Sequence, residues 1–316
     1  MLAMRSLSHA LVSLSCCLAL HGTATAAPHL DTTDVQRMIT DLERGRGKGT
    51  ATARWLLLEP ELQALSPEDR RGALKRLARR VKASPLAPWL HRAQSRQLSR
   101  GDLATVAEAV GMIPGWLVSS AHRGLSGLDG AAEAEVAGGG QLAWREEAAQ
   151  LDAGVVLAPA AGGGSSSLRV LASTITLERK TRALLWLGLC GDVALHVDDT
   201  WIGRREGLLR AAPDQLAVPL ELSPGVHEVS LVVATPGGCS SSVHGRWTDH
   251  RGRSLRRAVY GLPKAPPSFR DSPSTALLPT HPHLAMSETA EPLDAWLTHA
   301  ARKRLGLPTP MHGETT

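Results

Sequence analysis

The stretch "PGGCSSSVHG" most invites a catalytic interpretation. It holds Cys239 and His244, and Asp249 follows shortly after. A nucleophile needs a base positioned beside it in space and an orienting group behind that base, and closeness in sequence supplies neither. The chain also has no Gly-x-Ser-x-Gly elbow. We therefore interpret the stretch as a polar loop between two strands, and expect no catalytic residue and no enzymatic activity.

A second kind of chemistry, metal binding, is suggested by Asp192, Asp198 and Asp199 in "CGDVALHVDDTWIGRREG". Calcium prefers hard oxygen ligands at loop ends, but aspartate is also an ordinary turn residue. Two adjacent aspartates point apart in an extended chain, and their spacing matches no known calcium loop. We therefore favour a hairpin turn between two short strands.

Histidines offer only a weak metal site. His281 and His283 lie two apart in "THPHLAM", and a third ligand would have to fold over them. The chain has no Cys-x-x-Cys pair and no His-Glu-x-x-His motif. We therefore expect no bound metal and no cofactor.

Tryptophan is unusually frequent, with eight residues against one Phe and one Tyr. Trp186 and Trp247 lie in apolar runs and are expected in the core. Trp201 follows the acidic turn, where an exposed indole near Asp199 and Arg204 would stack on a sugar ring while polar groups hold its hydroxyls. Large aromatic side chains bury most of their area, so we favour the alternative that Trp201 closes the end of the core.

The first 26 residues have the pattern of a secretory signal peptide. Arg5 precedes an apolar run, and small residues end at Ala26, where we expect cleavage. The run is shorter than the roughly 20 residues of a membrane span. We therefore expect an exported protein, periplasmic or extracellular, without a transmembrane span after cleavage. A lipid anchor on Cys17 is less favoured, because the residues before it fit a lipoprotein cleavage site poorly.

After cleavage only two cysteines, Cys190 and Cys239, remain. An oxidising compartment permits a disulfide, and two cysteines allow only one. Each lies near a predicted strand end. The sequence is equally compatible with one bridge and with two separately buried thiols.

Charge is nearly balanced in this chain of 316 residues, with 35 Lys and Arg against 30 Asp and Glu. Basic residues gather in "EDRRGALKRLARRVK" at 68–82 and "DHRGRSLRR" at 249–257. Such clusters can contact nucleic acid or anionic lipid. The first run shows helical spacing of its apolar residues, so we favour a solvated face and expect no nucleic-acid partner.

Residues 27–113 are expected to form a helical domain. Ser66 is placed to cap a helix that begins at Pro67 and ends before Pro85. The stretch that follows, up to residue 112, predicts an antiparallel pair of helices, the unit of helical repeat arrays. No second copy appears at a fixed period, so a short helical bundle is the better description.

Residues 114–262 predict an antiparallel β-sandwich, because short apolar or alternating runs are separated by Gly, Pro and Asp. In "GVHEVSLVVA", Val229, Leu231 and Val233 share one face, and Gly225 is free to take a positive φ. The expected strands cover 167–178, 182–189, 192–199, 200–203, 215–222, 225–234 and 241–249.

Residues 263–316 are rich in proline at first and then regain helical spacing. We expect a linker or a loosely ordered strap, followed by a helix over about 291–305. The expected fold class is therefore α+β: a helical bundle, an antiparallel sandwich and a short terminal helix.

Several motifs give the chain a family likeness. They are the strand end Leu187-Gly188, the turn at 198–199, "LRAAPDQLAVPLEL", and "WTDHRGRSL" with Asp249 and Gly252. Over residues 85–262 the chain resembles a galactose-binding-like jelly-roll module of exported bacterial tetratricopeptide-repeat proteins. The resemblance implies a jelly roll related in shape to carbohydrate-binding domains, entered by a tryptophan-bearing strand in "GMIPGWLVSS".

Two functions follow as hypotheses. The first is an exported, non-enzymatic interaction or scaffold module of the cell envelope, which uses the helical grooves and the sandwich edge toward a protein partner. The second is carbohydrate binding through the loop edge around Trp201, with Asp199 and Arg204 beside it. An exposed Trp201 would favour the second function.

Overall fold

The computed structural model describes residues 32–44, 58, 61–62, 65–80, 93, 108, 110–123, 143–149, 154–157, 166–198, 200–239, 242–250, 252–267, 276–279, 301–303, 305 and 307. The expected signal peptide, Asp199 and the pair His281 and His283 lie outside these residues, so what we predict for them stays a prediction. Of the expected terminal helix, only four positions are described.

Helix α4 (Pro67–Arg80) begins where its capping residue requires. The Ser66 hydroxyl oxygen accepts a hydrogen bond of 3.1 Å from the Asp69 backbone N–H, and the Ser66 O–H donates to the Asp69 carboxylate at 2.7 Å. This pair satisfies an N–H that has no partner inside the helix. Glu68 and Asp69 also place negative charge at the positive end of the helix dipole. The predicted start of this helix is confirmed.

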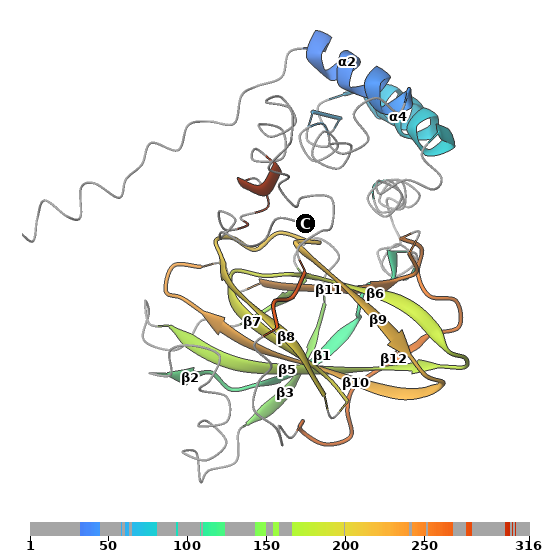
Figure 1. Cartoon of the computed structure of the whole chain (residues 1–316). Coiled ribbons are helices and arrows are strands. Elements are labelled where there is room, and N and C mark those ends of the chain that lie inside the picture. Colours follow the sequence, from blue (N-terminus) through green and yellow to red (C-terminus); the bar gives the residue numbers. More distant parts are fainter. Residues whose placement is uncertain are drawn as a thin grey trace, which may run out of the picture.

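Helix α2 (Thr32–Glu43) packs against α4, and Figure 1 shows the two side by side. Ile39 and Leu42 of α2 and Leu74 and Leu77 of α4 are all buried. These side chains belong to the same apolar cluster as the core of the sandwich. The helical segment is thus held by burial of one apolar stripe on each helix.

Two antiparallel sheets form the sandwich, and Figure 1 shows them as two layers. The larger sheet has the order β3-β1-β5-β10-β7-β8, with β2 and β12 also paired to β5, and the smaller has the order β4-β11-β6-β9. The strands are β1 (Gly115–Ser119), β2 (His122–Arg123), β3 (Trp144–Ala148), β4 (Val155–Val156), β5 (Ser167–Leu177), β6 (Thr181–Gly188), β7 (Gly191–Val197), β8 (Thr200–Leu208), β9 (Leu216–Leu222), β10 (Gly225–Thr235), β11 (Ser242–Thr248) and β12 (Val259–Gly261).

Strand β10 shows why alternation decides the layering. Its odd-numbered residues Val229, Leu231 and Val233 point into the main core between the sheets, as predicted. Val232 points the other way, into a second apolar cluster on the outer face of the larger sheet. Gly225 begins the strand with a φ of 130°, which confirms the left-handed turn residue expected there.

At one edge of the sandwich the chain crosses from the smaller sheet to the larger. The Ile113 N–H donates to the Gly245 carbonyl at 3.0 Å, and the Trp247 N–H donates to the Gly111 carbonyl at 2.7 Å. This segment therefore pairs with β11 before it enters β1, whose Trp116 is fully buried. The entry strand that carries a tryptophan is confirmed.

At the opposite edge a short strap, residues 276–279, joins the two sheets. The Arg204 N–H and carbonyl of β8 bond to the strap backbone at 2.7 and 2.8 Å, and the Ala217 N–H of β9 donates to it at 3.2 Å. Leu278 enters the main core. Gly203 is required here, because a Cβ at that position would lie 2.6 Å from a strap carbonyl oxygen. This part of the proline-rich tail is thus an integral strap.

One end of the sandwich is tied by a disulfide between Cys190 and Cys239, whose Cα atoms are 5.8 Å apart. The bridge links the β6–β7 turn to the β10–β11 loop. Nearby, the buried Gln215 side chain accepts a hydrogen bond from the Leu189 N–H at 2.7 Å and donates to the Leu305 carbonyl at 2.6 Å. The C-terminal segment is therefore fixed to this end by a fully buried amide.

The seven strands expected from the sequence correspond to β5 to β11, although β8 runs to Leu208 and is longer than expected. The short strands β2, β3, β4 and β12 were not predicted, since they carry too few residues for alternation to show. Within the described part of the chain, no helix is long and apolar enough to cross a membrane.

Candidate functional site

The acidic stretch after β7 is a hairpin turn, as predicted. Asp198 takes the left-handed φ of 55° between β7 and β8. Its carboxylate accepts the Glu228 N–H at 2.9 Å and faces the His227 Nδ1 at 2.7 Å. The side chain therefore ties the turn to the neighbouring strand β10.

Asp192 and Asp198 do not converge on a metal site. Asp192 lies near the start of β7 and accepts the Gly207 N–H at 2.8 Å, while Asp198 follows the end of the same strand. Six residues of extended chain separate them by roughly 20 Å. No three metal-ligating side chains meet among the described residues.

His227 forms hydrogen bonds through both of its ring nitrogens. Its Nδ1 faces the Asp198 carboxylate at 2.7 Å, and its Nε2 lies 2.8 Å from the Ser223 carbonyl oxygen. Burial lowers the pKa of His227, but the hydrogen bonds to Asp198 and Ser223 and the charge of Asp198 outweigh burial, so its pKa is raised. The protonated ring, which donates from both nitrogens, is the form that this geometry stabilises.

Trp201 is largely buried. Its side chain is 9% exposed and lies in the outer apolar cluster with Leu168 and Val232. His196 packs edge-on against it, with ring centroids 5.3 Å apart. Arg204, three residues later, has its Nε 3.5 Å from the Glu206 carboxylate. The expected burial of Trp201 is confirmed, but Trp201 lies in the outer cluster and not at the end of the core between the sheets. It therefore offers no exposed indole for a sugar to stack on.

The cysteine in "PGGCSSSVHG" is not a free nucleophile, because the sulfur of Cys239 forms the disulfide with Cys190. Asp249 accepts the Arg253 N–H at 3.0 Å inside a tight turn that follows β11. A thiolate, a base and an orienting carboxylate are thus not assembled from these residues. The polar-loop interpretation agrees with this geometry.

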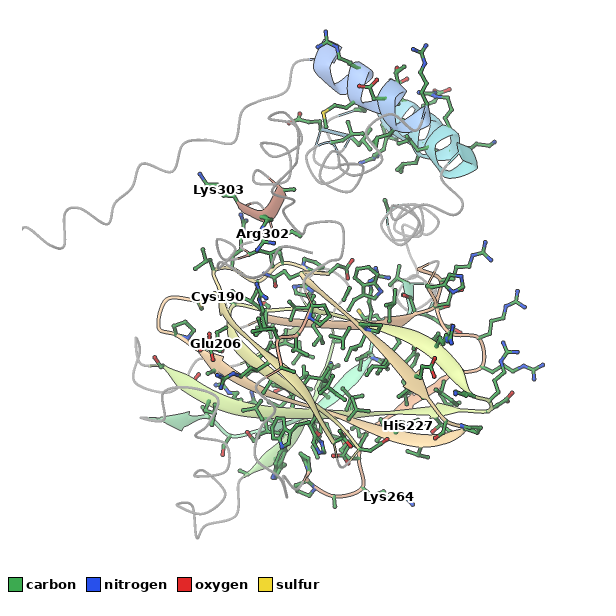
Figure 2. All side chains as sticks on the ribbon, in the orientation of Figure 1. Cys190, Glu206, His227, Lys264, Arg302 and Lys303 are labelled. Atoms are coloured by element: carbon green, nitrogen blue, oxygen red, sulfur yellow. A yellow bond between two sulfur atoms is a disulfide. The ribbon has the colours of Figure 1, made fainter. Side chains whose placement is uncertain are left out.

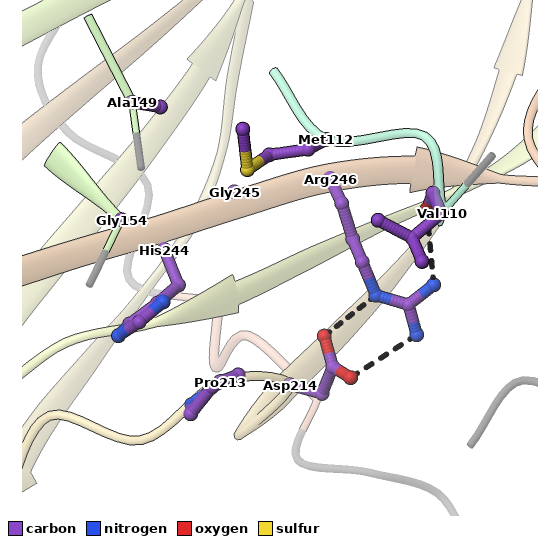
Figure 3. A pocket seen from close by; sticks show the side chains of 9 residues that line it. All are labelled: Val110, Met112, Ala149, Gly154, Pro213, Asp214, His244, Gly245 and Arg246. Carbon is purple, nitrogen blue, oxygen red and sulfur yellow. Dashed lines mark hydrogen bonds and ion pairs between the residues drawn. The ribbon is translucent and has the colours of Figure 1, made fainter. Parts of the chain in front are cut away.

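Buried charge gathers instead around Arg246 of β11 (Figure 3). Its Nε and Nη2 donate to the two carboxylate oxygens of Asp214 at 2.8 and 3.1 Å, and its Nη1 donates to the Val110 carbonyl at 3.4 Å. The guanidinium also lies over the Trp186 ring, 4.9 Å from its centroid. Both charged side chains are buried. Such a bidentate pair specifies how β11 meets the β8–β9 loop.

The pocket beside this ion pair is small. It measures about 20 Å³ and is bordered by Met112, His244 and Arg246, among others. That volume holds about one water molecule. Figure 3 shows the guanidinium and carboxylate facing each other, so their polar atoms are directed at each other and not at the pocket. The arrangement is suited to holding the fold and not to binding a ligand.

A larger cavity lies at the edge of the larger sheet. It measures about 400 Å³ and lies between the start of β1, the end of β3 and the end of β12. We call it the edge groove. Its lining residues are Pro114, Gly115, Glu146, Glu147, Ala148, Gly261 and Leu262.

The composition of the edge groove suits a ligand that has both polar and apolar surface. Gly115, Ala148 and Gly261 carry little or no side chain, which leaves the space open, while the carboxylate of the exposed Glu146 can accept hydrogen bonds. Glu147 receives the Arg145 guanidinium at 2.6 Å. Ligand pockets commonly measure about 300 to 1,000 Å³, so the groove has the size of a binding site.

The sequence pattern did not predict the edge groove. Glu146 and Glu147 stand in "WREEA", where two charges in a row conceal the alternation of a short strand. The two glycines come from segments more than 140 residues apart in the chain, and only the pairing of β1 and β12 with β5 brings them together. The one usable signal was Trp144, a large side chain at the start of an otherwise polar run.

No family model matches the chain, and no curated protein does. Solved structures match it weakly. A β-glucosidase from Kluyveromyces marxianus is 10% identical with a TM-score of 0.30, and the match covers 42% of this chain and 16% of that one. The chain thus spans a small part of that enzyme.

Two further matches are to smaller domains. A family 35 carbohydrate binding module from an environmental isolate is 15% identical with a TM-score of 0.20, covering 28% of this chain and 68% of that one. The PA14 domain of the MpAFP antifreeze protein is 9% identical with a TM-score of 0.32, covering 48% and 93%. At these TM-scores the likeness carries no information about ligand or activity.

Proposed function

We propose that this protein is an exported, non-enzymatic interaction module of the cell envelope, and that the edge groove is its ligand surface. The observation that carries the proposal is the groove itself, a cavity of about 400 Å³ at a sheet edge, with the exposed Glu146 among its lining residues. The buried ion pair of Arg246 and Asp214 has no comparable space next to it. A partner that offers N–H or O–H donors would complete the groove.

The geometry of the groove favours binding over hydrolysis. Glu146 and Glu147 are neighbours in a strand, so their side chains point to opposite faces. Paired carboxylates that hydrolyse a glycosidic bond must flank it from two sides at a set distance. The disulfide of Cys239 and the turn role of Asp249 give no support to a nucleophile either.

Carbohydrate binding is the second candidate, now at the edge groove and not at Trp201. A sugar offers hydroxyl donors and apolar C–H faces together, and the groove offers Glu146 as an acceptor beside the apolar Pro114 and Leu262. A protein partner would use the same acceptors with backbone N–H groups.

The proposal extends to the fold family of the sandwich, the kind of helical bundle and the export of the chain. The sandwich is a galactose-binding-like jelly roll, supported by its motifs at residues 187–188, 198 and 249–252. The helices before it form a small bundle of the tetratricopeptide kind, supported by the packing of α2 on α4. Export is supported by the pattern of the first 26 residues.

Titration of the purified protein tests the proposal. Polysaccharides and envelope protein fragments are titrated separately, and tryptophan fluorescence is read, since Trp144 lies two residues from Glu146. Glu146→Gln removes a charged acceptor and is expected to weaken binding about tenfold or more. Glu206→Gln, an exposed glutamate on β8 at the other edge of the sheet, is the matched control.

Saturable binding that Glu146→Gln weakens and Glu206→Gln leaves intact would support the groove. Binding of polysaccharides alone would select the carbohydrate candidate, and binding of envelope proteins alone the interaction module. Binding that is the same in both variants, or no binding to either class, would overturn the proposed site.

A further inference from the structure

The end of the sandwich where β5 turns into β6 carries exposed basic and apolar side chains that the edge groove does not use. We call it the basic end. Its members are Arg179, Lys180, Arg182, Arg256, Arg257, Val226 and Val259. Arg256 and Arg257 come from the basic stretch "DHRGRSLRR" at 249–257. In Figure 2 several nitrogen-tipped side chains project from this part of the molecule.

Strand pairing brings these residues together. Thr176 of β5 faces Val226 of β10 on one side and Val259 of β12 on the other. The two valines therefore flank one position on the same face of the sheet, roughly 10 Å apart. Arg182, at the start of β6, pairs with Glu221 of β9. The β5–β6 turn joins the two layers at this point, so one end of the molecule presents both sets of side chains.

The basic end keeps an excess of positive charge. Two carboxylates lie among its five cations: Glu221 receives Arg182 at 2.7 Å and Lys180 at 3.3 Å, and Glu178 receives Arg257 at 3.2 Å. The side chains of these three paired cations are 73% to 85% exposed. Water screens such pairs, so they contribute little to stability. The cations thus remain available to an anionic surface.

The valines distinguish between anionic partners. Val226 is 66% exposed and Val259 is 63% exposed. Transfer of either side chain from water into an apolar layer would lower its free energy. A nucleic acid would meet the cations with phosphates but would offer the valines no apolar layer. An anionic bilayer offers phosphates to the cations and an acyl boundary to the valines. We propose that the basic end docks the protein on an anionic lipid surface.

Co-sedimentation of the purified full-length protein with vesicles tests this inference. Binding is expected to phosphatidylcholine vesicles that contain phosphatidylglycerol and not to pure phosphatidylcholine, and to weaken as salt is added. Arg179→Ser together with Arg256→Ser leaves the three ion pairs above intact. At about 1 kcal/mol per basic residue, this double variant should lower the partition coefficient roughly 30-fold.

Two further double variants test the role of the valines and whether the effect is confined to the basic end. Val226→Ser with Val259→Ser should lower partitioning several-fold without changing its salt dependence, because no charge is removed. Leu209→Ser with Arg210→Ser changes one apolar and one basic residue at the other end of the sandwich, where Leu209 is 72% exposed, and should leave partitioning unchanged.

Three results would overturn the inference: equal binding to both kinds of vesicle, no binding to either, or equal loss in the control and the basic-end variants. The groove proposal is tested separately, since Glu146→Gln should leave vesicle binding unchanged. A failure of either proposal is therefore distinguishable from a failure of the other.

Discussion

The pocket at Arg246 and the edge groove both place charged side chains beside a cavity, but they differ in what those charges face. The Arg246 guanidinium meets Asp214, the Val110 carbonyl and the Trp186 ring, and the adjacent cavity measures about 20 Å³. In the edge groove the cavity measures about 400 Å³ and Glu146 is exposed. A buried ion pair without adjoining space can stabilise only the fold, whereas an exposed carboxylate beside a cavity of several hundred Å³ has room for a ligand.

The largest expected effect is on stability, where a substitution at Arg246 should cost much more than one in the edge groove. Arg246→Met leaves the Asp214 carboxylate buried without its partner and should lower the free energy of unfolding by about 3 to 5 kcal/mol. Glu146→Gln should change it by less than about 0.5 kcal/mol, as at most exposed positions. Urea denaturation of both variants measures the difference.

A second variant tests whether the unpaired buried carboxylate causes that loss of stability. Arg246→Met combined with Asp214→Leu removes both charges, so it should recover most of the lost stability. A free energy of unfolding as little changed by Arg246→Met as by Glu146→Gln would show that the buried ion pair does not hold the fold.

The next largest effect on stability should come from the disulfide, which lies away from the edge groove. Cys190→Ser with Cys239→Ser opens a bridge between residues 49 apart and should destabilise the fold by about 2 to 4 kcal/mol. Ligand binding at the edge groove should persist wherever the variant remains folded, because the bridge lies at another place on the sandwich. Loss of binding in a variant with an intact circular dichroism spectrum would contradict this separation.

The smallest effect should come from the turn of the acidic hairpin, where Asp198 is 46% exposed and water screens its pairing with His227. Because the pKa of His227 is raised in the folded state, its contribution is complete below its unfolded pKa of about 6.5 and is lost as the pH rises through the folded value.

Denaturation curves at a series of pH values measure that contribution. The parent protein should lose stability between mildly acidic and mildly alkaline pH, and Asp198→Asn should lose less. The same pH slope in both proteins would show that the pair contributes nothing measurable.

Alternation and turn residues predicted the long strands because their neighbours in sequence already determine which face is buried. Val229, Leu231 and Val233 show this, and so does the cap at Ser66. The edge groove could not be predicted in the same way, since Gly115 and Gly261 meet only through their shared neighbour β5. For Trp201 the size of the side chain was enough to predict burial, but not the outer cluster that buries it, because that cluster draws on β5 and β10.

The strap at 276–279 has a consequence for how the chain is made. It covers the outer edges of β8 and β9, yet it is synthesised after every strand of both sheets. A chain that emerges N-terminus first, from a ribosome or from an export channel, therefore leaves these two edges unpaired until residues 276–279 have emerged, and unpaired strand edges are where chains associate with one another. Truncation before residue 276 should accordingly turn a discrete protein into an aggregating one.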